Sequence, residues 1–213
     1  LSMVMSPGFP SFATFNVEAF LAHWARFYQE IYGMTLDPAS VLLPPVGEAL
    51  GAGVVMLPGI TIEQDLAKIR ERTPGEALYR CTDQAIDGLI QKDKEPSRPS
   101  VPYAIWTAPV AEATEQAPQL ARKSYLDIQE MNAPNMTFAE YTRFFLWYLW
   151  ATGQPLDKRV ITLSCSLGVG GVVLGGRWCG GGFYVDWYDR DVSSAHLRAR
   201  RVVLAKRTLS EFF

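Results

Sequence analysis

The chain has 213 residues, of which 48% are hydrophobic, 20% charged and 12% aromatic; this composition is that of a globular protein and excludes a disordered one. The formal net charge of −2 excludes a protein that is basic over its whole surface and coats nucleic acid. Only two histidines, His23 and His196, are present, so most multi-histidine metal sites are excluded. We expect a cytoplasmic protein with no membrane partner, because the sequence has neither a secretory signal pattern nor an apolar run of membrane-spanning length. We also expect no metal and no cofactor.

We expect residues 1–15 to form a flexible segment and residues 16–213 to form a single α+β domain. The charged, proline-rich stretch 92–102 is the place where that domain would subdivide. The first predicted helix runs from Asn16, which can cap it, to Gly33, because apolar residues recur every three or four positions in between.

Two strand–helix units follow in the sequence. Residues 54–57 form an apolar run typical of a buried strand, and a capping-box pattern opens a helix over 61–73. Residues 77–81 and 83–90 repeat this plan, and another strand is predicted over 103–106. This β-α-β-α-β order favours parallel or mixed strand pairing through crossover connections.

The strongest predicted helix covers residues 138–151. Thr137 and Glu140 form a capping box at its start, and Gly153 ends it. Because its apolar residues occur on nearly every side, this helix must be surrounded by other parts of the fold or by a second copy of the chain. The sequence therefore predicts either a core helix or a helix that also seals a homodimer.

From Val160 onward the apolar residues alternate with a period of two, which predicts an antiparallel meander. Glycines separate its strands and predict tight turns, because the sequence lacks the further residues of a phosphate-binding loop. We therefore expect an α+β fold in which the β-α-β-α-β portion and the C-terminal meander pack around the buried helix, with an edge strand over 196–204. In the last full strand of the meander, alternation places Phe183, Val185 and Trp187 on one face and Tyr184, Asp186 and Tyr188 on the other.

Nucleophilic catalysis is one interpretation of this region. It requires a cysteine or serine beside a histidine, and His196 follows the meander, which contains Ser164, Cys165, Ser166 and Cys179. A small hydrolase-like enzyme with Cys165, or a nearby serine, as nucleophile and His196 as base is therefore the alternative prediction. No family-specific motif surrounds these residues.

The distribution of charge favours a different interpretation. Residues 196–213 carry five basic side chains and one acidic side chain, although the whole chain has a net charge of −2. Arginines next to aromatic side chains on a sheet can stack on bases while their guanidinium groups meet phosphates. The residues predicted to bind in this way are Trp178, Tyr184, Trp187, Tyr188, Arg198, Arg200 and Arg201.

A simpler interpretation stays open beside it: the aromatic side chains are ordinary sheet packing, and the arginines pair with acidic groups of the same chain. On balance we expect a non-enzymatic binding or interaction protein that uses an aromatic sheet face and the basic C-terminal segment. Its partner would be a nucleic acid or another protein.

Three stretches of the sequence carry a resemblance. The first combines residues 78–83 with residues 103–106, and the second combines the pairs Thr152-Gly153 and Leu156-Asp157 with residues 161–165. The third combines Arg177-Trp-Cys-Gly-Gly-Gly-Phe-Tyr-Val-Asp-Trp-Tyr188 with Leu197-Arg-Ala-Arg200. Over about residues 55–203 the chain resembles a group of uncharacterised bacterial proteins of unknown function. The resemblance implies a shared fold and assigns no catalytic residue.

Three departures from the pattern of that group replace polar residues. Thr107-Ala108-Pro109 stand where the group has an arginine–aspartate pair, residues 167–171 replace a polar turn, and Pro155 replaces a histidine. If these positions carry chemistry in the group, the resemblance implies that this chain has lost it.

Overall fold

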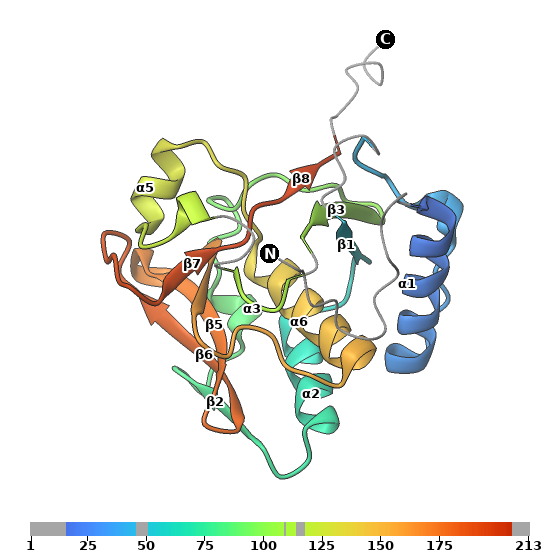
Figure 1. Cartoon of the computed structure of the whole chain (residues 1–213), viewed down its shortest axis with the longest axis horizontal. Coiled ribbons are helices and arrows are strands. Elements are labelled where there is room, and N and C mark those ends of the chain that lie inside the picture. Colours follow the sequence, from blue (N-terminus) through green and yellow to red (C-terminus); the bar gives the residue numbers. More distant parts are fainter. Residues whose placement is uncertain (1–15, 46–50, 109, 114–117, 206–213) are drawn as a thin grey trace, which may run out of the picture. The chain divides into compact units, whose positions relative to one another are not determined.

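The computed structural model describes residues 16–45, 51–108, 110–113 and 118–205 (Figure 1). Helices and strands both contribute substantially, and the strands form two separate sheets. The predicted α+β class is therefore confirmed. The predicted flexible segment 1–15 lies outside the described residues. No helix within the described ranges has the length and apolar character needed to cross a membrane.

The chain divides into two compact units. The described part of the larger unit lies within residues 59–98 and 110–201, and that of the smaller unit lies within residues 16–58, 99–109 and 202–205. The chain leaves the larger unit after Arg98, inside the stretch 92–102 that the sequence marks by its charges and prolines.

A five-stranded sheet forms the centre of the larger unit, with the strand order β2-β6-β5-β4-β7. Strands β4, β5 and β6 pair antiparallel in succession, which confirms the predicted meander, whereas β2 pairs parallel with β6 and β7 parallel with β4. The elements of this unit are α2 (Ile62–Arg72), β2 (Ala77–Arg80), α3 (Ile86–Leu89), the 3-10 turn η3 (Pro118–Leu120), α5 (Tyr125–Glu130), α6 (Phe138–Thr152), β4 (Ile161–Leu167), the 3-10 turn η4 (Val169–Gly171), β5 (Val173–Cys179), β6 (Gly182–Tyr188) and β7 (Leu197–Ala199).

Helix α6 packs against one face of this sheet. The capping box predicted at its start forms as expected, and Gly153 ends the helix with a left-handed φ of 68°. The Phe145 ring lies 4.4 Å from that of Phe183 on β6, and the Tyr141 hydroxyl donates to the Gly176 carbonyl on β5 at 3.1 Å. Helix α2 lies next to α6 (Figure 1). The face that carries Phe183 is called the inner face below, and the opposite one the outer face.

The prediction of a turn at Gly175-Gly176 is wrong, because both glycines lie inside the single strand β5. A Cβ atom at Gly175 would lie 2.8 Å from the Tyr188 ring, and one at Gly176 would lie 2.5 Å from the Tyr141 ring. Glycine in a strand interior often marks such a close approach. The turn prediction is confirmed at Gly180 and Gly181, where φ is 55° and 80°.

The smaller unit combines helix α1 (Val17–Tyr32) and the 3-10 turn η1 (Pro38–Ser40) with a three-stranded sheet of order β1-β3-β8, made of β1 (Ala52–Met56), β3 (Tyr103–Thr107) and β8 (Val203–Leu204). Asn16 caps α1 by accepting from the Ala19 N–H, and Gly33 ends it with a φ of 67°, as the sequence predicts. The fully buried Trp24 and Phe27 lie on the predicted apolar stripe of α1.

The strand order of the N-terminal portion differs from the expected crossover arrangement. Strand β1 pairs antiparallel with β3, and β2 joins the other sheet beside β6. The predicted edge strand over 196–204 is also divided, since β7 belongs to the larger sheet and β8 to the smaller one. These pairings join segments far apart in the sequence, so local patterns do not specify them.

Candidate binding surface at the edge of the larger sheet

A row of three side chains crosses the outer face of the larger sheet. The strand register aligns Tyr79 of β2 with Tyr184 of β6, and Tyr184 with Arg177 of β5. The two tyrosine rings stack with their centroids 4.2 Å apart and their planes 18° apart, and the Arg177 guanidinium carbon lies 5.6 Å from the centroid of the Tyr184 ring. Cross-strand pairs of this kind stabilise a sheet through stacking and cation–π attraction.

The row ends in an exposed ring. Because β2 and β5 flank β6 on opposite sides, Tyr79 and Arg177 approach the Tyr184 ring from opposite sides and occupy both of its faces. Tyr79 is 45% exposed, and it lies on the last strand of the sheet. Tyr184 and Arg177 are only partly exposed, so Tyr79 is the most exposed residue of this row and the one that a ligand reaches first.

The register divides the other predicted aromatic side chains between the two faces. Trp178 pairs with Phe183, and its ring stacks on Phe145 of α6 on the inner face. Trp187 lies four residues after Phe183 on β6, hence on the same face, and packs against Gly168, where a Cβ atom would overlap the indole ring. Tyr188 lies on the outer face but packs against the buried cluster that contains Leu163. Tyr184 is therefore the one of these four residues that joins the exposed row.

The backbone of β2 presents hydrogen-bonding groups to the same edge. The Ala77 and Cys81 N–H groups donate to β6 carbonyls, at Gly181 (3.2 Å) and Val185 (3.0 Å). Because alternate residues of a strand point their N–H and C=O groups to opposite sides, those of Leu78 and Arg80 point away from β6. Among the described residues, none accepts a hydrogen bond from these two N–H groups.

A groove of about 560 Å³ lies between β2 and α2. Its apolar wall consists of Leu66, Ala67, Pro74 and Leu78, and its charged lining consists of Glu63, Arg70, Glu71 and Arg80. Arg80 is held on this wall because its guanidinium donates to both carboxylate oxygens of Glu63 at 2.9 Å. Its volume lies within the range of about 300–1,000 Å³ that is typical of ligand-binding clefts.

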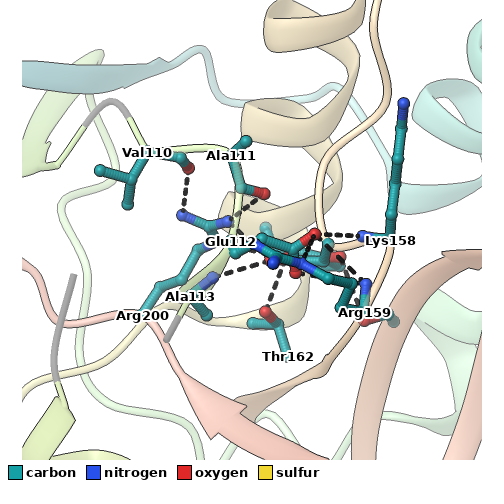
Figure 2. A network of polar contacts seen from close by, with 11 residues as sticks. Val110, Ala111, Glu112, Ala113, Lys158, Arg159, Thr162 and Arg200 are labelled. Carbon is teal, nitrogen blue, oxygen red and sulfur yellow. Dashed lines mark hydrogen bonds and ion pairs between the residues drawn. The ribbon is translucent and has the colours of Figure 1, made fainter. Parts of the chain in front are cut away.

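Arg200, predicted as a ligand-binding residue, is instead fully buried and belongs to a polar network inside the larger unit (Figure 2). Its guanidinium donates to the Asp157 carboxylate at 2.7 Å and to the carbonyls of Val110 and Ala111 at 3.1 and 3.3 Å. Asp157 also accepts from the Thr162 hydroxyl at 2.6 Å. With these partners inside the fold, Arg200 is not available to an external phosphate.

A second carboxylate in Figure 2 holds the backbone of the same region. Glu112, almost fully buried, accepts from the N–H groups of Lys158 at 3.0 Å and Arg159 at 3.2 Å. The Ala113 N–H donates to Asp157 at 2.9 Å. The network thus fastens residues 110–113 to residues 157–159.

The remaining arginines of the predicted basic segment are also separated. Arg198 is buried, and one of its guanidinium nitrogens donates to the Leu197 carbonyl at 2.6 Å. Arg201 is exposed. Lys206 and Arg207 lie outside the described residues. Of the three arginines in the described part of this segment, Arg201 is the exposed one.

The structure does not bring Cys165 and His196 together. The His196 carbonyl accepts from the Ile161 N–H at 2.8 Å, and Cys165 lies four residues further along β4, about 13 Å away at the rise of a strand. Cys165 is buried, its thiol donates to the Asn135 carbonyl at 3.2 Å, and burial raises its pKa far above the ordinary value. Neither the distance nor the protonation state suits a nucleophile–base pair.

No protein-family model matches the chain, and comparisons with curated proteins and with solved structures give no match either. The resemblance to uncharacterised bacterial proteins therefore stays a prediction. Two of the segments that carry it do meet in the fold, because Asp157 and Arg200 form the buried ion pair described above.

Sequence reasoning missed Tyr79, Arg177 and the open edge of β2. The periodicity of residues 77–81 does predict a strand, but the partner of that strand decides whether Tyr79 meets Tyr184. One feature of the sequence could have indicated this surface. The short strand over 77–81 carries a tyrosine next to an arginine, and both residue types are enriched in protein interfaces.

Cys81, directly after β2, gives a test of the local environment. Partial burial of its thiol, and next the nearby Asp186 carboxylate, raise its pKa to about 11. Only the thiolate reacts with iodoacetamide, so we expect the labelling rate of Cys81 to rise about tenfold per pH unit from pH 8 to 10. Mass spectrometry of labelled peptides measures it, with Cys81→Ser as the control. A rate that levels off near pH 9 would contradict the proposed environment.

Proposed function

We propose that the protein is a non-enzymatic interaction module that binds another protein at the edge of its larger sheet. The observation that carries this proposal is the stacked row Arg177–Tyr184–Tyr79, which ends in an exposed tyrosine ring on the terminal strand β2. Tyrosine and arginine are enriched among the residues that supply most of the binding energy in protein interfaces. A partner that places a flat side chain on Tyr79 extends a stack that the sheet already orders.

The charges near this row favour a protein over a nucleic acid. Affinity for nucleic acid depends on several lysines or arginines that neutralise phosphates, and Arg198 and Arg200 are buried. Arg177 is the cation of the row itself, and the Asp186 carboxylate lies on the same outer face two residues beyond Tyr184. A surface of mixed charge with an exposed ring is typical of protein interfaces.

Panning a phage-displayed library of random 12-residue peptides on the intact chain tests the proposal. We expect the selection to enrich peptides that bind the wild type. Their affinity for the Tyr79→Ala variant is expected to be about 30-fold weaker, since truncation of a central interface tyrosine costs about 2 kcal/mol. Leu126→Ala is a matched control, because Leu126 is similarly exposed (43%) but lies on α5, away from the row. It is expected to leave the affinity unchanged.

Labelled oligo-dT, oligo-U and oligosaccharides are titrated in parallel at two salt concentrations. We expect no saturable binding of these three probes. Enrichment of no peptide would overturn the proposal, and so would a nucleic acid or saccharide that binds the wild type and is lost in the Tyr79→Ala variant.

A further inference from the structure

We infer that the partner is an extended peptide segment that adds an antiparallel strand to β2 and inserts alternate side chains into the groove against α2. This inference rests on the proposed interaction function and specifies the form of the partner. Three features of one edge carry it: the open backbone groups, the groove and the exposed end of the aromatic row.

The backbone of β2 supplies the first feature. Leu78 and Arg80 direct their N–H and C=O groups away from β6, and β2 terminates the strand order of the described sheet. A polypeptide strand offers donors and acceptors with the matching two-residue repeat, which is the basis of recognition by strand addition. Antiparallel addition gives the straighter and stronger hydrogen bonds.

The two faces of β2 supply the other features. Side chains of an added strand alternate between the faces, so every second one enters the groove beside Leu66, Ala67 and Leu78. Its neighbours in the peptide lie on the outer face beside Tyr79. The peptide predicted from this geometry alternates an apolar residue, for the groove, with an aromatic or arginine residue, for the Tyr79 ring.

Charge complementarity adds a requirement at the groove. Glu63 is paired with Arg80, and Glu71 is paired with Lys68. Arg70 also lines the groove, and no carboxylate in the described part of the chain forms an ion pair with it. The peptide is therefore expected to carry an acidic side chain on its groove-facing side, next to the apolar one.

The decisive experiment uses the tightest-binding peptide from the display selection, synthesised with an N-methyl group at each backbone nitrogen in turn. An added strand points alternate N–H groups at β2, so we expect the affinity measured by fluorescence polarisation to fall at least tenfold at every second position and little at the positions between. Loss at three or more consecutive positions, or at none, would overturn strand addition.

A charge exchange checks the assigned groove residue. The Arg70→Glu variant is expected to weaken binding at least tenfold, and replacing the acidic residue of the peptide by lysine is expected to restore it. Arg72→Glu is the matched control, because Arg72 lies on the same helix turn and does not line the groove. Equal losses in the two variants, without restoration, would contradict the placement of the peptide.

These outcomes separate the two proposals. If a peptide binds and depends on Tyr79 but shows no alternation on N-methylation, strand addition is wrong and the interaction function stands. If no peptide binds, both are wrong. Light scattering tests the other possible occupant, a second copy of the chain. A dimer that dissociates in the Tyr79→Ala variant would assign this edge to a second copy and overturn the proposal of a peptide partner.

Discussion

Replacing Asp157 with alanine is expected to lower the free energy of unfolding by about 3–5 kcal/mol, the cost of leaving a buried charge without its partner. Asp157 and Arg200 are both fully buried, and their closest approach is 2.7 Å. Truncation removes the carboxylate but leaves the Arg200 guanidinium in place, with the Val110 and Ala111 carbonyls as its remaining acceptors. Urea unfolding monitored by tryptophan fluorescence measures the loss.

The backbone at Asp157 adds to this expectation. Its φ is 50°, in the left-handed region that aspartate and asparagine tolerate better than alanine. Asp157→Asn keeps that tolerance and an oxygen for the Ala113 N–H, so it is expected to lose less stability than Asp157→Ala. The difference in the free energy of unfolding between the two variants measures the contributions of the backbone and the hydrogen bonds. The loss of stability in Asp157→Asn measures mainly the contribution of the charge.

Lys158→Ala is the control, because Lys158 is exposed and its ammonium contacts Gln154 at the surface. A change of no more than about 0.5 kcal/mol is expected there. If Asp157→Ala unfolds within about 1 kcal/mol of the wild type, the ion pair does not hold this region together.

Local signals in the sequence predicted the ends of the helices. Asn16 and Gly33 for α1, and Thr137 and Gly153 for α6, act on backbone groups within four residues, so no knowledge of the rest of the fold is needed. The meander is equally local, since each strand pairs with the next one in the sequence.

Predictions failed where a residue acts on a distant segment. Gly175 and Gly176 follow the local pattern of a turn, but the rings of Tyr188 and Tyr141 require the space. Arg200 contributes to an apparent basic patch, yet Asp157, 43 positions earlier in the chain, holds it in the interior. The sequence therefore predicts Tyr184 as part of the candidate surface but not its partner Tyr79. Neither strand's own sequence specifies the parallel pairing of β2 with β6.

A second buried ion pair is expected to contribute as much to the stability of the fold as the first. Asp65 of α2 and Arg143 of α6 are both fully buried, with the Arg143 Nε 2.8 Å from the Asp65 carboxylate. The Thr142 hydroxyl donates to the other carboxylate oxygen at 3.1 Å. Asp65→Ala is expected to lower the free energy of unfolding by about 3–5 kcal/mol, because it leaves the buried guanidinium without its carboxylate. Urea unfolding measures this loss too.

The double variant Asp65→Leu with Arg143→Met distinguishes a buried charge from a packing defect. Removing both charges together leaves apolar side chains of similar size, and such replacements are often neutral or stabilising. Thr142 keeps a second acceptor in the Ala139 carbonyl at 3.1 Å. We therefore expect the double variant to be more stable than either single one. Equal losses in Asp65→Ala and the double variant would show that packing between α2 and α6, rather than charge pairing, holds the helix that forms one wall of the groove.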